Sequence, residues 1–203
     1  MKMFLTVLSI ICLGFSEIQE SPSDYDYQLS SIAQEFRREI MNEEACESLY
    51  RDAEDLVDEI DEALDEEDEY TYEDLLRLKN LQEEAEALEN FIASVGDCGG
   101  SIPSIKQINL ANQRVNAHIS YVISDKYCVD IVLVEIDDFV SYLAENKSRY
   151  NYTVSYKWNA LNGIISGEGY MGLAKYSMRQ IYNNREDSAT KNISIFGVKC
   201  VEF

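Results

Sequence analysis

Residues 49–88, LYRDAEDLVDEIDEALDEEDEYTYEDLLRLKNLQEEAEAL, decide the fold of the first half of the chain. Apolar residues recur every three or four positions on both sides of the acidic run at 65–69, which has no apolar side chain. Such spacing lines up apolar side chains on one face of an α-helix. Five like charges in a row repel one another and stay in solvent. The stretch therefore predicts two amphipathic helices joined by an exposed tip, an antiparallel helical hairpin.

The apolar stripe extends beyond this stretch in both directions. Upstream it begins at Leu29 and weakens at 42–44, where a break or a new helix start is an alternative to one long helix. Downstream it ends at Val95, and Gly96 is typical of a helix end. We expect the hairpin to span residues 29–96, after a flexible acidic tail at 17–28. Because two helices alone form a thin core, the stripes could also form a coiled-coil homodimer interface.

The second half predicts strands. Apolar and polar residues alternate over 114–124 and 151–160, and residues 128–136 are rich in Val and Ile. Asn162-Gly163 is typical of a type I′ hairpin turn. The returning segment 164–182 contains glycines that favour kinks or bulges, and a final strand closes the chain at 190–203.

The fold class follows from these two halves. Asp137 and Asp138 could cap a short helix reaching Glu145, with a continued strand as the alternative. We therefore expect an α+β protein, with an N-terminal acidic antiparallel helical hairpin followed by an antiparallel sheet of about five strands with one short helix. Glycines and a proline at 96–103 mark the boundary, so the β domain is expected over 104–203.

The first sixteen residues predict the compartment. Lys2 is followed by an apolar run from Met3 to Phe15, and small residues precede a cleavage point after Ser16. This pattern is typical of a secretory signal peptide at 1–16, and it is shorter than a membrane span. We expect a secreted, extracellular protein.

Cysteine usage agrees with that compartment. Four cysteines remain after the signal peptide, and an even number in a secreted chain predicts two disulfides with three alternative pairings. The pairs Cys46–Cys98 and Cys128–Cys200 are favoured because each closes within one half. The chain has no CxxC pair and one histidine, His118, so we expect no zinc or other metal site and no cofactor.

Three Asn-x-Ser/Thr triplets predict glycosylation of a secreted chain. Glycans require exposed asparagines, so the triplets also predict surface positions. The acceptor residues are Asn146, Asn151 and Asn192.

Charge is distributed unevenly. Residues 17–100 carry 28 acidic and 5 basic side chains, a net of −23, whereas residues 101–203 carry 10 and 11, a net of +1. This balance disfavours nucleic acids and anionic membrane surfaces as partners and favours a basic extracellular protein. A solvated face that only maintains solubility is the alternative. The candidate partner-binding residues are Asp61, Glu62, Asp65, Glu66, Glu67, Asp68 and Glu69.

The sequence offers no recognisable catalytic arrangement. A nucleophilic mechanism would depend on His118, and none of the common catalytic or phosphate-binding motifs occurs. We therefore predict a secreted, disulfide-bonded binding protein whose acidic hairpin docks a basic protein. One alternative is a carrier of a small apolar ligand between the sheet and the hairpin, lined by Tyr152, Tyr156 and Trp158. The second alternative is an enzyme of unrecognised type.

Overall fold

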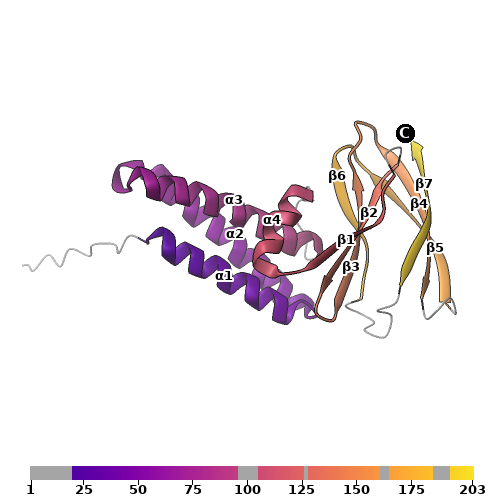
Figure 1. Ribbon diagram of the computed structural model, residues 1–203, viewed down its shortest axis with the longest axis horizontal. Coiled ribbons are helices and arrows are strands. Elements are labelled where there is room, and N and C mark those ends of the chain that lie inside the picture. The colour runs from indigo at the N-terminus through magenta and orange to yellow at the C-terminus, as the bar shows by residue number, and fades with distance from the viewer. Residues whose placement is uncertain (1–19, 96–104, 126–127, 161–164, 185–192) are drawn as a thin grey trace, which may run out of the picture.

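The structure, a computed structural model, describes residues 20–95, 105–125, 128–160, 165–184 and 193–203. These residues form four α-helices, one 3₁₀ turn and seven strands, which confirms the α+β class. Figure 1 shows a bundle of helices packed against one four-stranded sheet, with a three-stranded sheet on the far side. The predicted signal peptide at 1–16 lies outside the described residues.

The predicted hairpin is present as α2 (Glu43–Asp65) and α3 (Tyr72–Val95), joined through a 3₁₀ turn at Glu67–Glu69. The stripe upstream of residue 43 belongs to a separate helix, α1 (Pro22–Glu39), so the break considered at 42–44 occurs. Asn42 explains it, because its side chain accepts a hydrogen bond from the Ala45 N–H and caps α2. The helical layer is thus larger than a hairpin.

The expected flexible tail at 17–28 is wrong from residue 22 onward, where α1 begins. Ser21 donates from its backbone N–H and its hydroxyl to the Asp24 carboxylate, at 2.9 and 2.7 Å. Pro22 occupies the first helical position, where its missing N–H does no harm. Tyr25 is only 6% exposed, so core packing also holds this first turn.

A fourth helix, α4 (Ile105–Val115), replaces the beginning of the expected β domain. The alternation at 114–124 is a strand only in its second part, β1 (His118–Ile123). Asn116 ends α4 in a left-handed conformation with φ 56°, and its N–H donates to the Asn112 carbonyl at 2.8 Å. The apolar spacing at 105, 108, 111 and 115 was a helical signal that the alternation after residue 114 concealed.

The strands form two antiparallel sheets instead of one sheet of about five strands. Sheet A has the order β1-β2-β3-β6, and sheet B has the order β5-β4-β7. The predicted strands at 128–136, 151–160 and 190–203 correspond to β2, β4 and β7. The bounds of the remaining strands are β2 Asp130–Ile136, β3 Phe139–Asn146, β4 Tyr152–Ala160, β5 Ile165–Leu173, β6 Ser177–Asn183 and β7 Ser194–Glu202.

The expected short helix at 137–145 is wrong, because this segment is β3. Ile136 pairs with Phe139, so Asp137 and Asp138 make a two-residue turn, with Asp137 at φ 51°. Every residue of β3 is buried, since sheet A is covered on both faces. A strand covered on both faces loses the alternating pattern that marks a half-buried strand.

The returning segment 164–182 is two strands in different sheets, and the expected bulge in its glycine-rich part is wrong. β4 and β5 pair without interruption from Tyr152 opposite Leu173 to Ala160 opposite Ile165. The chain leaves sheet B after Leu173 and turns at Tyr176, which has φ 53°. The predicted Asn162-Gly163 turn lies outside the described residues.

Two hydrophobic cores fill the spaces between the layers. The first joins the helices to one face of sheet A and contains Phe36 and Phe91, whose rings meet edge to face at 6.1 Å. It continues onto β2 through Val132 and Val134. The second lies between the two sheets and includes Ile131, on the opposite face of β2. No helix within the described part of the chain is long and apolar enough to cross a membrane.

Candidate functional site

The predicted acidic tip lies at the end of the helical layer farthest from the sheets (Figure 1). Thr71 caps α3, because its hydroxyl accepts from the Asp74 N–H at 3.2 Å and donates to the Asp74 carboxylate at 2.6 Å. Asp61 accepts a hydrogen bond from Gln82 across the hairpin. The Glu67 side chain lies outside the described atoms. The exposed members of the set are Asp61, Glu62, Asp65, Glu66, Asp68 and Glu69.

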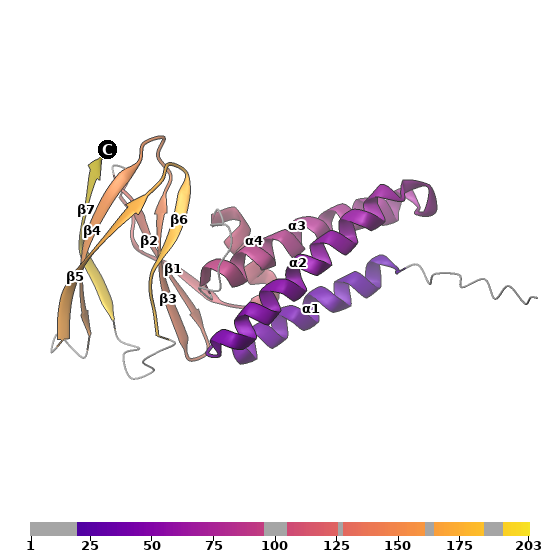
Figure 2. The ribbon, with the colours of Figure 1, turned by 180° about the vertical axis from the view of Figure 1, so that it is seen from behind.

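A groove between α1 and α2, which we call the acidic groove, was not predicted from the sequence. Figure 2 shows these two helices side by side along the bundle. The groove has a volume of about 410 Å³. Leu49, Ile32 and Leu56 contribute apolar surface, and none of the described residues that line the groove is basic. Its acidic lining residues are Glu35, Asp52, Asp55 and Glu59.

The acidic groove and the acidic tip are continuous along α2. Asp55, Glu59, Glu62 and Glu66 follow one another at steps of four, three and four residues, which places them on one helix face. The groove, unlike the tip, requires α1 to fold back beside α2, which one long helix through residues 42–44 would not allow. The candidate surface is therefore an acidic strip along α2, and the tip is only its end.

The acids of the groove repel one another. Burial raises the pKa of Asp52, and the charges of Asp55 and Glu35 raise it further. Burial likewise raises the pKa of Glu59, followed by the charges of Glu20, Asp55 and Glu62. Burial and neighbouring acids are thus the causes of both shifts, and no cation is among them.

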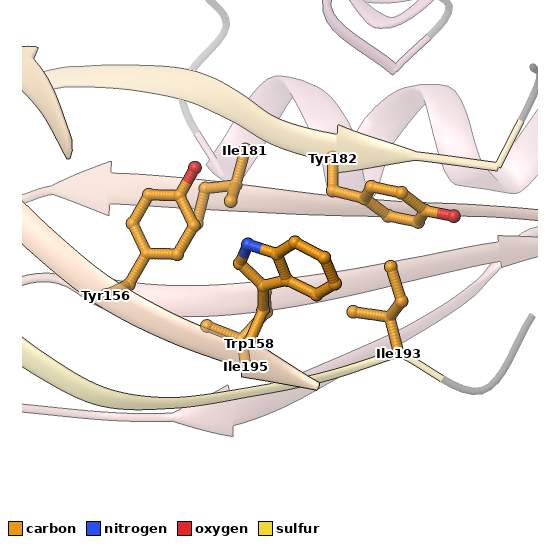
Figure 3. A pocket seen from close by; sticks show the side chains of 6 residues that line it. All are labelled: Tyr156, Trp158, Ile181, Tyr182, Ile193 and Ile195. Carbon is orange, nitrogen blue, oxygen red and sulfur yellow. The ribbon is translucent and has the colours of Figure 1, made fainter. Parts of the chain in front are cut away.

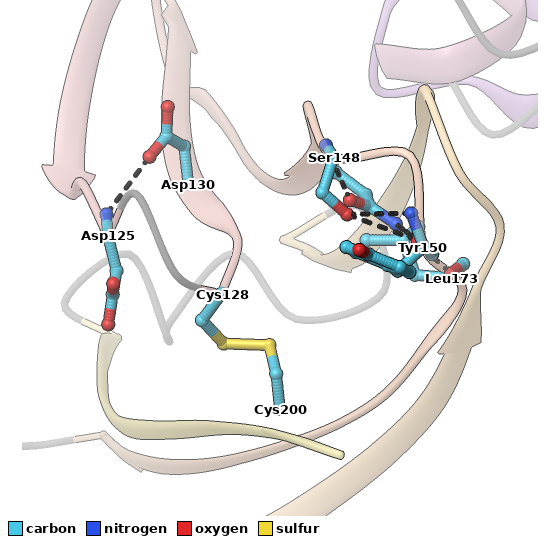
Figure 4. The surroundings of a disulfide bond; sticks show 8 residues. Asp125, Cys128, Asp130, Ser148, Tyr150, Leu173 and Cys200 are labelled. Atoms are coloured by element: carbon cyan, nitrogen blue, oxygen red, sulfur yellow. Dashed lines mark hydrogen bonds between the residues drawn. A yellow bond between two sulfur atoms is a disulfide. The ribbon is translucent and has the colours of Figure 1, made fainter. Parts of the chain in front are cut away.

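One of the two predicted disulfides is confirmed. Cys128 and Cys200 are bonded, with their Cα atoms 5.4 Å apart (Figure 4). The bond ties the start of β2 to β7, and so sheet A to sheet B. Cys46 is fully buried in α2, with its Sγ 4.0 Å from the Ile92 carbonyl oxygen. Its predicted partner, Cys98, lies outside the described residues.

The predicted glycosylation of Asn146 is contradicted by the structure, because this residue is only 1% exposed. Its amide donates to the carbonyls of Tyr150 and Ala174 at 2.8 and 2.9 Å, and its oxygen accepts from the Ser148 N–H at 2.9 Å. An amide used in this way at the end of β3 has no room for a glycan. Asn151 is half-buried and accepts from the Lys175 N–H at 3.0 Å. Asn192 lies outside the described residues.

The structure brings together only two of the three aromatic residues of the predicted ligand site. Tyr156 and Trp158 line a cavity of about 90 Å³, together with isoleucines and Tyr182 (Figure 3), whereas Tyr152 is not part of its lining. The cavity lies between the two sheets and not between the sheet and the hairpin. Pockets for small molecules have volumes of roughly 300–1,000 Å³, so this cavity is small for a carrier.

His118 lies on the surface, with its side chain 74% exposed and its Nε2 4.0 Å from a Glu135 carboxylate oxygen. The geometry therefore does not assemble a Ser-His-Asp or Cys-His arrangement around it among the described residues. Within the same residues, no group of three or more His, Cys, Asp or Glu side chains could hold a metal ion.

Comparison with known proteins gives no match: no family model, no curated protein and no solved structure is similar to this chain. Function is therefore inferred from the residues and their geometry, and among the described surfaces the acidic strip along α2 offers the clearest basis for that inference.

Proposed function

We propose that the protein is an extracellular binding protein that docks a basic protein partner in the acidic groove and on the acidic tip. The observation that carries this proposal is the groove, where four acids line a shared hollow and no lysine or arginine is among its lining residues. The excess charge of residues 17–100, a net of −23, surrounds the same surface.

Lysine and arginine side chains of a partner would relieve the repulsion between Glu35, Asp52, Asp55 and Glu59. Complementary charge raises the rate of association and selects against acidic competitors. The apolar surface from Ile32 and Leu56 gives the aliphatic stems of lysine and arginine a place to pack. We expect binding that weakens strongly as salt shortens the Debye length from about 10 Å at 0.1 M to about 3 Å at 1 M.

The test is a pull-down from the protein's native fluid with three baits at low and high salt. The first bait is the wild-type chain, and the second carries Asp52→Asn, Asp55→Asn and Glu59→Gln. The control bait has the same net charge as the second but carries its three changes away from the groove, at Glu47→Gln, Glu83→Gln and Glu202→Gln, all exposed positions.

We expect the wild-type and control baits to retain the same basic protein at low salt and to release it at high salt. The groove variant should retain at least about tenfold less, because several charge-assisted contacts are lost together. Equal retention by the groove variant would overturn the proposal, and equal loss from both variants would reduce it to an effect of net charge.

A further inference from the structure

The strands at the edges of the two sheets differ in how their free side is protected. These strands are β1 and β6 in sheet A, and β5 and β7 in sheet B (Figure 2). A free edge presents unpaired N–H and C=O groups to any extended chain, and natural sheets blunt it with bulges, charged side chains or proline. An edge without such protection is therefore a candidate site for the addition of a strand.

The edges formed by β1, β6 and β7 are interrupted. The pairing shifts at Val122 of β1, at Ile181 of β6 and at residues 197–198 of β7, and each time the surplus residue belongs to the edge strand. In β7 the irregular segment includes Gly197, which has φ 60°. A bulge bends the strand and leaves a residue out of the ladder, so these three edges are poor templates for another strand.

The edge formed by β5 is regular. All nine residues of Ile165–Leu173 pair with β4 without a shift. The strand contains no proline, lysine or arginine, and its one charged residue, Glu168, is paired with Lys157 of β4 at 3.1 Å. Its other side has no strand partner among the described residues. β5 is therefore a long, straight edge that is open to another strand.

We infer that β5 pairs antiparallel with β5 of a second copy of this chain, which joins the two B sheets into one sheet of six strands. A twofold axis at Gly169 brings all nine residues of each strand into pairing, with Ile165 of one copy opposite Leu173 of the other. The outer edges of the joined sheet are then the two β7 strands, whose bulges oppose the addition of further strands. The assembly therefore stops at two copies.

The side chains of β5 favour a second copy in this register. With Gly169 opposite itself, the exposed Glu168 of each copy lies opposite Tyr170 of the other. Tyr170 is 70% exposed, and its hydroxyl donates to the Glu168 carboxylate at 3.1 Å within one chain, so the same two groups can also bond across the strands. A register centred on Glu168 would place two carboxylates opposite each other, which is destabilising. The order of residues about Gly169 is thus complementary to itself.

The test is sedimentation equilibrium of the full chain over a range of concentrations at about 0.15 M salt. Tyr170→Glu places a like charge opposite Glu168 of the other copy, whereas Tyr170→Lys places an opposite charge there. Val201→Glu and Val201→Lys are the matched controls, because Val201 is 66% exposed on β7 and lies outside the proposed interface. Hydrogen exchange of the β5 amides is measured on the same samples.

We expect the wild type to form a dimer that dissociates on dilution, because nine residues a side are fewer than the roughly 20–30 of a standard interface. Tyr170→Glu should weaken the dimer at least about tenfold, and Tyr170→Lys should dimerise at least as tightly as the wild type. Both Val201 variants should dimerise like the wild type. The β5 amides should exchange more slowly as the concentration of the wild type rises.

Four outcomes would overturn the inference. The first is a wild type that stays monomeric at every concentration, and the second is a dimer that tolerates Tyr170→Glu. Equal weakening by Tyr170→Glu and Val201→Glu would show an effect of net charge, and equal weakening by Tyr170→Glu and Tyr170→Lys would exclude the pairing of Glu168 with Tyr170. Protection of the β5 amides in a monomer would accompany the first outcome if another part of the chain covers this edge.

Discussion

Single residues with positive φ redirect the chain at three places. Asn116 ends α4, Asp137 turns β2 back as β3, and Tyr176 passes the chain from sheet B to sheet A. Asparagine and aspartate tolerate the left-handed region better than most residues, whereas tyrosine does so rarely. Residue type therefore favours the first two turns, although the sequence analysis predicted neither of them, whereas nothing in the local sequence marks Tyr176.

Glycines in β5 show a second effect of single residues. Gly167 and Gly169 lie directly opposite Trp158 and Tyr156, and the aromatic rings cover them. A Cβ at Gly167 would lie 2.7 Å from Trp158 Cζ2, inside van der Waals contact. The glycines therefore make room for rings at the cavity between the sheets and do not create a bulge.

The change Gly167→Ala should lower the free energy of unfolding by about 1–3 kcal/mol, because the tryptophan ring must leave its packed position. Gly172→Ala is the matched control in the same strand, since an added Cβ there meets no atom within 4 Å. It should be neutral or stabilise by up to about 1 kcal/mol. Urea denaturation of the two variants measures the difference, and equal stability would show that the ring is not held against Gly167.

At the scale of elements, Arg114 connects three helices. It lies in the last turn of α4, and its guanidinium donates to Glu84 of α3 at 2.8 Å and to Ser30 of α1 at 2.8 Å. It also pairs with Asp26 of α1 at 2.7 Å. The side chain is only 21% exposed, so this network is better shielded than a surface salt bridge.

Replacement of Arg114 by Ala should lower the free energy of unfolding by about 1–3 kcal/mol, because Glu84 and Asp26 lose their shared cation. Arg114→Lys should restore only part of the lost free energy of unfolding, since one ammonium cannot reproduce a planar guanidinium with several donors. Arg149→Ala, an exposed arginine outside the helical layer, is the control. Chemical denaturation followed by helical circular dichroism measures all three, and an Arg114→Ala chain as stable as Arg149→Ala would contradict this role.

Most elements that the sequence predicted have a one-sided pattern, whereas β2 was predicted from its composition rich in Val and Ile. α2 and α3 have long apolar stripes, and β4 alternates because one of its faces meets solvent. The elements that it missed lack such a pattern or are short: β3 is buried on both faces, and α4 has only three turns. The acidic tip depends on local charge and was predicted, whereas the acidic groove depends on α1 packing beside α2. The division into two sheets depends on pairings between distant strands, which no local pattern encodes.

At the scale of the whole molecule, the net charge is distributed unevenly between the helical layer and the two sheets. The helical layer holds nearly all of the net charge, and the two sheets are close to neutral. An excess of like charge destabilises the compact state by self-repulsion. This excess lies along the part of the chain that forms α1, α2 and α3 and that includes the acidic groove, so stability and the proposed binding should respond to the same conditions.

The pH dependence of stability follows from the acidic side chains whose pKa values are shifted in the folded chain. Burial first, and then neighbouring acids, raises the pKa of Asp52 and Glu59, so the folded chain binds more protons than the unfolded chain at mildly acid pH. Burial also raises the pKa of Glu89. For such groups the free energy of unfolding increases as pH falls from neutrality toward their ordinary values of 3.8 for Asp and 4.5 for Glu.

Exposed acids with lowered pKa values oppose this trend only at lower pH. A hydrogen bond from Ser21 lowers the pKa of Asp24, and one from Arg37 lowers that of Asp137. Their contribution to stability is present above the ordinary value of 3.8 and is lost as pH falls below it. The two sets together predict a maximum of stability on the acid side of neutrality, above the range in which Asp24 and Asp137 titrate.

We therefore expect the urea midpoint to rise between about pH 7 and about pH 5, and to fall again below about pH 4. Salt at about 1 M should raise the midpoint at pH 7 more than at pH 5, because it screens the same repulsion. The variant with Asp52→Asn and Glu59→Gln should be more stable than the wild type at pH 7 and should show a smaller rise on acidification. A midpoint that falls steadily from pH 7 downward would contradict the repulsion in the groove, and with it the reason for a basic partner to bind there.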